Sequence, residues 1–136
     1  MKYQVILDFD GYVLSIKHTN TVWDIVELDL AKYDLSKLNA YKLGKNELIF
    51  DAKKWEEIEN EKQKQADQKE ISELETKLNE TDYIMAEWAE EVLGCENRLT
   101  WIVDVIAINL KYTKQYAQTL KNRKTWRARI KELKGE

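Results

Sequence analysis

The chain contains no proline, and this absence constrains its fold more than any other feature of the sequence. Proline ends or kinks helices, and it makes up about 5% of average protein sequences. Glycine, the other common helix-ending residue, occurs only at positions 11, 44, 94 and 135. Because such signals are scarce in the second half of the chain, we expect that half to form long helices.

The charge of the chain is sorted by position. Residues 51–98 carry fifteen acidic and seven basic side chains, net −8, whereas residues 111–134 carry nine basic and one acidic, net +8. The net charge of −3 therefore hides a dipolar molecule. Its basic end could pair with the acidic middle of the same chain, with a second copy, or with an external polyanion.

Residues 1–50 show the alternation of apolar and polar side chains that is typical of β-strands. Asp10-Gly11 predicts a two-residue hairpin turn, because glycine accepts a positive φ. A small antiparallel meander should result, packed on a helix or on a neighbouring subunit. The predicted strands are residues 3–7, 12–16, 22–28, 40–43 and 47–50.

From Asp51, a suitable N-cap, the pattern becomes helical. Residues 59–70 offer only one apolar side chain, which predicts that this part of the helix is exposed or frayed. Thr81-Asp82 supplies a second cap, for a helix that Gly94 ends. The predicted fold is α+β: a β module over residues 1–50, a polar helical spacer over 51–80, and a helical bundle over 81–136 that packs and oligomerises.

Residues 99–110 are the most apolar part of the chain. As a helix, this segment would turn Leu99, Ile102, Val103, Ile106 and Leu110 inward and leave Trp101, Val105 and Ile108 on the opposite side. A helix that is apolar on both sides needs two partners, which predicts a homo-oligomer such as a trimer. A strand remains the alternative, because its β-branched residues fit both structures. A membrane span is not expected, since spanning needs about 18 apolar residues.

Residues 5–14 resemble the first motif of haloacid-dehalogenase-type phosphatases, an apolar strand that ends in Asp-x-Asp-Gly. The resemblance implies a nucleophile at Asp8 and a general acid and base at Asp10, beside a magnesium ion. Tyr12 departs from the threonine of that family, and no later acidic motif on a strand end follows. We therefore prefer the hairpin, and expect no enzyme and no catalytic, cofactor or metal site. His18 is the only histidine and Cys95 the only cysteine, so neither a zinc cluster nor an intrachain disulfide is expected.

The basic end could also bind nucleic acid, with lysines and arginines on phosphates and Trp126 on a base. Three observations argue against this alternative: the pI is about 5.4, an acidic helix of similar size lies in the same chain, and apolar residues are interleaved with the basic ones. The apolar residues predict a packed helical face. They are Tyr112, Tyr116, Leu120, Ile130 and Leu133, interrupted by Arg123.

The C-terminal part of the chain resembles small proteins encoded in the tail modules of phages and prophages of Gram-positive bacteria, and tail-fibre assembly proteins. The resemblance rests on the helix start Thr81-Asp82-Tyr83 and on the last helix, in which Arg123, Arg127, Ile130 and Leu133 follow one another at spacings of four, three and three. It implies a tail-tip or baseplate component, or a chaperone for fibre assembly. Either would be made in the host cytoplasm, and the former would end in the virion tail.

Our hypothesis is a non-enzymatic phage tail protein that attaches to copies of itself and to other tail proteins. The alternatives are a tail-fibre chaperone, a phage-encoded binder of nucleic acid or of a host protein, and, last, the phosphatase. Arg123, Arg127 and Arg129 are predicted to pair with acidic residues such as Glu87, Glu90 and Glu91. The candidate interface residues are Trp88, Trp101, Val105, Ile108, Arg123, Trp126, Arg127 and Arg129.

Overall fold

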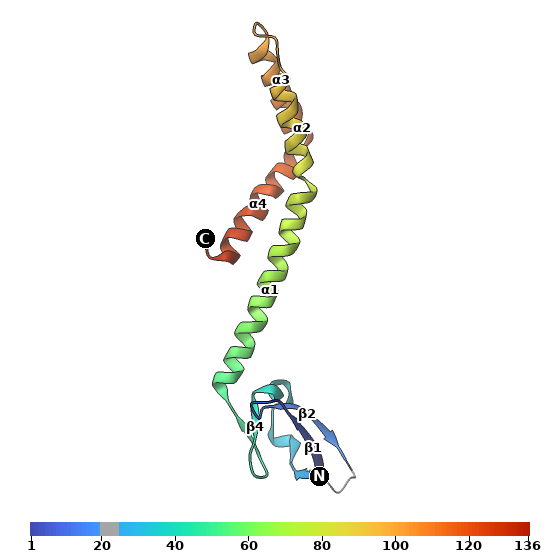
Figure 1. Cartoon of the computed structure of the whole chain (residues 1–136), viewed down its shortest axis with the longest axis vertical. Helices are drawn as coiled ribbons and strands as arrows, with labels where there is room; N and C mark the ends of the chain where they lie inside the picture. Colours follow the sequence, from blue (N-terminus) through green and yellow to red (C-terminus); the bar gives the residue numbers. More distant parts are fainter. Residues whose placement is uncertain (20–24) are drawn as a thin grey trace. The chain divides into compact units, whose positions relative to one another are not determined.

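A computed structural model describes residues 1–19 and 25–136, which form five strands, two short 3-10 helices and four α-helices (Figure 1). The predicted α+β class is confirmed. The chain divides into two compact units, residues 1–64 and residues 65–136. The boundary falls within the predicted helical spacer.

The first unit contains a three-stranded antiparallel sheet of β1 (Lys2–Leu7), β2 (Val13–His18) and β3 (Ile25–Glu27). The strand order is β2-β1-β3, so β3 pairs with β1, whereas a simple meander would place β2 in the centre. Residues 22–24 of the predicted third strand lie outside the described residues. Residues 25–27 of the predicted strand form β3, and the buried Leu28 follows it.

The hairpin between β1 and β2 has a longer turn than the sequence predicted. The Asp8 N–H donates to the Tyr12 carbonyl at 2.8 Å, so residues 9–11 form the loop and Gly11 takes a φ of 83°. This is the three-residue loop with glycine in the left-handed position. The Asp8 carboxylate stabilises it by accepting the N–H groups of Asp10 at 2.9 Å and Tyr12 at 2.8 Å.

The second predicted hairpin is confirmed as β4 (Tyr41–Leu43) and β5 (Leu48–Phe50), paired antiparallel. The short helices η1 (Leu30–Lys32) and η2 (Leu35–Ala40) precede it and were not predicted from the sequence. The core of the unit draws on both sheets. Its buried cluster consists of Val13, Leu28, Tyr41 and Leu48.

Helix α1 (Ala52–Glu80) begins where the sequence predicted. The Asp51 carboxylate accepts the N–H groups of Lys53 at 3.1 Å and Lys54 at 3.2 Å, which caps the helix. Tyr12 donates its hydroxyl to the same carboxylate at 2.7 Å and so ties the first hairpin to the helix start. Residues 59–70 are mostly exposed but remain helical, so they are not frayed.

The second unit contains the rest of α1 together with α2 (Asp82–Leu93), α3 (Trp101–Gln115) and α4 (Ala117–Lys134). Helices α2 and α3 lie side by side, joined by residues 94–100, and α4 returns along the last part of α1 (Figure 1). Gly94 ends α2 as predicted. The helical prediction for the apolar segment is confirmed from Trp101 onward, and the strand alternative is wrong.

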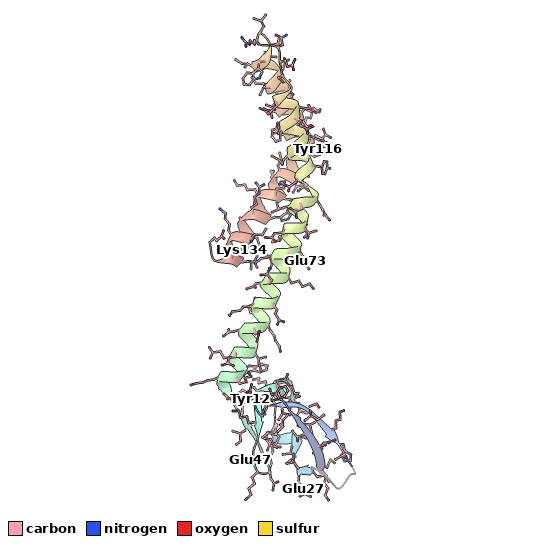
Figure 2. All side chains as sticks on the ribbon, in the orientation of Figure 1. Tyr12, Glu27, Glu47, Glu73, Tyr116 and Lys134 are labelled. Carbon is pink, nitrogen blue, oxygen red and sulfur yellow. The ribbon has the colours of Figure 1, made fainter. Side chains whose placement is uncertain are left out.

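The contact between α1 and α4 carries the apolar cluster of this unit. Its buried members are Ile71 and Leu74 on α1 and Ile130 on α4. The predicted packed face is confirmed, because all of its apolar residues from Tyr112 to Leu133 are buried or half-buried. Figure 2 shows Tyr116 where α3 meets α4, and Lys134 near the end of α4. Leu78, Trp126 and Leu133 complete the cluster.

Candidate protein-protein interface

Helices α2 and α3 are joined by an aromatic contact. The rings of Trp88 and Tyr112 stack with their centroids 5.5 Å apart and their planes 5° from parallel. The Trp88 Nε1–H also donates to Asn109 Oδ1 at 2.8 Å. Tyr112 is buried, and its other neighbour is the ring of Tyr116, 5.8 Å away. Offset stacking of this kind adds to the effect of area burial and orients the two helices.

A carboxylate on α2 binds two donors on α3. Glu91 accepts the Lys111 ammonium at 2.8 Å and the Tyr112 hydroxyl at 2.8 Å. These two hydrogen bonds, that of Lys111 first, lower the pKa of Glu91 below its ordinary value. Donation to the Glu91 carboxylate in turn raises the pKa of Tyr112 to about 12. Together with the stacked rings, these contacts set which side of α3 faces α2.

The side of α3 away from α2 is apolar and uncovered. We call the residues on it the outer stripe. The prediction that these residues form the inner face is wrong: Val105 and Ile108 on the opposite side are half-buried instead. The physical reason is that Asn109, Lys111 and Tyr112 bind α2 and rotate the other face outward. The outer stripe consists of Ile102 (66% exposed), Val103 (68%), Ile106 (53%) and Leu110 (65%) on α3, together with Leu99 (97%) in the turn before the helix.

The outer stripe has the dimensions of a helix contact. At 3.6 residues per turn its side chains on α3 cover an arc of about 100°, and from Ile102 to Leu110 they extend about 12 Å along the helix. No charged residue belongs to it. Asp104, the one carboxylate between its ends, accepts the Thr100 hydroxyl at 2.7 Å. Contiguous apolar surface of this kind marks interaction sites on soluble proteins.

The apolar surface also includes part of α2. A shallow groove of about 400 Å³ is lined only by residues of this helix, and Leu93 at its end is 84% exposed. Apolar surface therefore occurs on both helices of the α2–α3 pair. The lining residues are Met85, Trp88, Ala89, Val92 and Leu93.

Arg123 on α4 is the buried charge of the unit, with 3% of its surface exposed. Its Nη1 donates to the Leu78 carbonyl at 2.7 Å and to the Thr81 hydroxyl, and its Nη2 donates to Asp82 Oδ1 at 2.6 Å. The three acceptors lie at the junction of α1 and α2. The charge of Arg123 suggested that it interrupts the packed face of α4. In the structure it instead holds that face against the junction through these hydrogen bonds.

Thr81 does not cap α2 in the way the sequence predicted. Its hydroxyl donates back to the carbonyls of Lys77 and Leu78, both at 3.0 Å, and no side-chain cap forms at the start of α2. Donation to a carbonyl three or four residues earlier is the usual alternative for a helical threonine. The oxygen remains available to Arg123, so the junction is stabilised from α4 instead.

The predicted partners of the basic residues are corrected by the structure. Arg123 binds Asp82, Arg129 binds Glu70 at 2.8 Å, and Glu91 binds Lys111. The hydrogen bond from Arg129 lowers the pKa of Glu70, and Glu70 raises that of Arg129. Lys134 adds a contact to Glu75 at 2.9 Å. Part of the basic end is thus matched by acidic residues of the same chain.

The predicted interface residues occupy three settings. Some lie half-buried on the side of α3 that faces α2, or on α2 itself, and Trp101 beside them is 46% exposed. Others belong to the contact between α4 and α1, and Arg127 on α4 is exposed. The first group is Trp88, Val105 and Ile108; the second is Arg123, Trp126 and Arg129.

The residues that carry the phosphatase resemblance have structural contacts. The Asp8 carboxylate accepts two turn N–H groups, and Tyr12 at the end of the turn binds Asp51. His18 makes an edge contact with the Tyr3 ring, 5.8 Å between centroids. Among the described residues, no group of three or more His, Cys, Asp or Glu could hold a metal ion. Within the same part of the chain, no helix has the length and apolar character needed to cross a membrane.

Comparisons with known proteins give no match. No protein-family model matches the chain, and no curated protein and no solved structure is similar to it at a significant level.

Proposed function

We propose that this chain is a non-enzymatic protein that works by protein-protein assembly, through the outer stripe of α3. One observation carries the proposal: four large aliphatic side chains are exposed on α3, and a fifth, Leu99, is exposed in the turn before it, while the opposite face of the helix is already in contact with α2. Exposed apolar surface is costly in water, at roughly 25 cal/mol per Å², and covering it drives association. The proposed partners are further copies of the chain and other proteins of the same assembly.

The proposed setting is the tail or baseplate of a phage, and its support is the resemblance of the C-terminal helices to small tail-module proteins. A protein of the virion tail would need at least two attachment surfaces, one toward its copies and one toward its neighbours. The β module supplies a candidate for the second: Phe9 at the tip of the first hairpin is fully exposed. Aromatic residues on such tips are frequent anchors of protein contacts.

A tail-fibre chaperone is the second candidate, supported by the same resemblance and the same exposed stripe. The two differ in where the protein is found after assembly. A structural component should be present at a fixed ratio to the other tail proteins in purified particles, as measured by quantitative mass spectrometry. A chaperone should be present in the producing cells and missing from the particles.

The assembly proposal is tested by the mass of the purified protein in solution, measured by light scattering over a range of concentrations. We expect a mass above the 16.2 kDa of one chain that rises with concentration. Ile106→Asn should return the protein to 16.2 kDa while leaving the circular dichroism of the helices unchanged.

The matched control is Leu35→Asn. Leu35 is 50% exposed and Ile106 is 53% exposed, but Leu35 lies on η2 of the other unit. This control should keep the wild-type mass. A wild-type protein that stays at the mass of one chain at every concentration would contradict the proposal.

A further inference from the structure

We infer that the exposed side of α4 binds the phosphate backbone of double-stranded nucleic acid. This function goes beyond the proposed assembly and uses a different helix, so either proposal can fail without the other. The contact is made by four basic residues of α4, which we call the basic face. They are Lys121, Lys124, Arg127 and Lys131.

The structure divides the cations of α4 into two sets. One set binds carboxylates on α1 and α2 at distances of 2.6 to 2.9 Å; its members are Arg123, Arg129 and Lys134. The residues of the basic face are exposed, and none of them forms an ion pair or a side-chain hydrogen bond with the described part of the chain. The acidic helices of the chain therefore neutralise only the first set, and positive charge remains on the exposed side of α4.

The basic face is continuous along the helix. Its residues follow one another at intervals of three, three and four, so at 3.6 residues per turn they share an arc of about 120°. From Lys121 to Lys131 they extend about 15 Å along the axis. Glu132 is the one carboxylate within α4, and it binds Arg129 at 3.0 Å. Because double-stranded DNA carries one negative charge per about 1.7 Å of its axis, a line of cations of this length can contact several phosphates.

The residue types of the basic face favour phosphates over a protein partner. Between Lys121 and Lys131, the other exposed residues are Thr125 and Ala128, so the face has no large apolar side chain to bury. Interfaces between proteins are depleted of lysine and enriched in aromatic residues. Phosphate contacts, by contrast, are made by lysine and arginine without any apolar area. The basic face of α4 thus differs in kind from the apolar outer stripe of α3.

Trp126 decides between double-stranded and single-stranded nucleic acid. The sequence suggested that this ring could stack on a base, but it is half-buried in the apolar cluster between α4 and α1. Single strands are usually bound by stacking their bases on aromatic rings, and the basic face offers none. The acidic pI of the chain does not oppose the contact, because charges more than about 8 Å away are largely screened at physiological ionic strength. We therefore expect binding to the backbone of a duplex, whatever its sequence.

The salt dependence of binding tests this inference. The full chain is titrated into a fluorescent DNA duplex of about 30 base pairs, and anisotropy reports the bound fraction. With four phosphate contacts, the affinity should fall about 100-fold between roughly 50 and 200 mM salt, and a duplex of unrelated sequence should bind equally well. A chain that does not bind either duplex at the lowest salt would overturn the inference.

A double variant tests whether the basic face makes the contact. Lys124→Gln combined with Arg127→Gln leaves two cations, so the same change of salt should weaken binding only about 10-fold. The matched control is Lys69→Gln combined with Lys77→Gln, which removes the same charge from exposed positions on α1. This control should keep the salt dependence of the wild type, and circular dichroism should show that both variants are folded.

Two results would overturn the inference even if the duplex binds. If the variant and its control lose the same affinity and the same salt dependence, binding follows the overall charge of the chain and not the basic face. If polyglutamate displaces the duplex at an equal concentration of negative charge, the face accepts acidic protein as readily as phosphate, and the assignment to nucleic acid is wrong.

Discussion

The two helix contacts of the C-terminal unit differ in how completely they cover the helices that make them. Where α4 lies on α1, the apolar side chains form a buried cluster and the flanking charges pair across the contact. Where α3 lies on α2, one face is joined by Tyr112 and Trp88, and the opposite face of α3 stays exposed. The α1–α4 contact is therefore complete within one chain, whereas the α2–α3 contact leaves an apolar face of α3 exposed.

The difference originates in the distribution of apolar residues around each helix. Helix α4 has a single apolar face and many lysines and arginines, so one partner helix is sufficient for it. Helix α3 is apolar on two opposite sides, and α2 can cover only one of them. Under the proposed function, a second molecule covers the exposed apolar side of α3.

The largest effect should come from Arg123 in the complete contact. Arg123→Met keeps the apolar stem but removes the hydrogen bonds to the Leu78 carbonyl, Thr81 and Asp82. We expect a loss of about 2 to 3 kcal/mol in the free energy of unfolding, because two half-buried acceptors and an exposed ion-pair partner lose their donor. Urea denaturation followed by circular dichroism measures it.

The matched control is Arg127→Met, one turn further along the same helix and exposed. It should change the free energy of unfolding by less than about 0.5 kcal/mol. Equal effects of the two substitutions would show that the buried contacts of Arg123 do not stabilise the α1–α2 junction.

The next largest effect is expected for Ile130→Ala in the α1–α4 contact, and Ile106→Ala in the outer stripe provides the comparison with the same residue type. Ile130 is 8% exposed in the α1–α4 cluster, whereas Ile106 is 53% exposed in the outer stripe. Ile130→Ala should cost about 2 kcal/mol at every protein concentration, because it leaves a cavity. Ile106→Ala should cost less than about 0.5 kcal/mol in dilute protein.

The effects of Ile106→Ala and Ile130→Ala on stability should depend differently on protein concentration. Ile106→Ala should lower the thermal midpoint more as the concentration rises, since association stabilises the wild type by mass action. Calorimetry over a range of concentrations measures this. A loss from Ile106→Ala that is the same at all concentrations would mean that no second molecule covers the stripe.

The parts of this fold that sequence analysis predicted are set by neighbouring residues. Asp51 caps the helix that follows it, and a segment without proline forms the expected long helices. The turn at Gly11 was predicted one residue too short, because the Asp8 carboxylate stabilises the longer loop and a carboxylate at that position fits either turn.

The parts that it did not predict depend on contacts between distant residues. The apolar run of α3 fits two rotations of the helix, and the choice is made by Glu91, which lies about twenty residues before its partners Lys111 and Tyr112. In the sequence, Arg123 looks like a break in the apolar face of α4. Its partners, the Leu78 carbonyl and Asp82, lie more than forty residues earlier, so the sequence pattern did not reveal them. The sequence therefore showed which residues of the candidate interface are apolar, but it did not show which of them are exposed.

A smaller effect should come from the polar contact between α2 and α3. Asn109→Ala removes the acceptor of the Trp88 Nε1–H bond, and we expect a loss of about 0.5 to 1 kcal/mol, as is usual for one neutral hydrogen bond. Tryptophan fluorescence in urea follows it. Asn122→Ala is the matched control, because Asn122 Oδ1 accepts a hydrogen bond from Gln118 of the same helix, and such a pair contributes about 0.3 kcal/mol. If both substitutions have the same effect, the Trp88 contact does not orient α3.

The smallest effect that we predict for the α2–α3 contact should appear only in alkali. The pKa of Tyr112 is raised to about 12 because its hydroxyl donates to Glu91, so the folded state favours the protonated phenol. A raised pKa means that the stabilisation is complete below the ordinary value of about 10 and is lost as the pH rises from there through about 12. Near-ultraviolet circular dichroism during an alkaline titration should follow this loss.

Tyr112→Phe should remove the tyrosine-linked part of the alkaline change, since phenylalanine keeps the stacked ring and has no proton to lose. Tyr12→Phe is the control, because Tyr12 has its pKa raised to about 12 by Asp51 but lies in the β module. It should leave the alkaline change of the α2–α3 contact intact. Arg129 stays charged over this range, so the α1–α4 contact keeps its ion pair with Glu70 while the α2–α3 contact weakens. If the α1–α4 and α2–α3 contacts lose the same stability between pH values of about 10 and 12, the hydroxyl of Tyr112 does not set the orientation of α3 against α2.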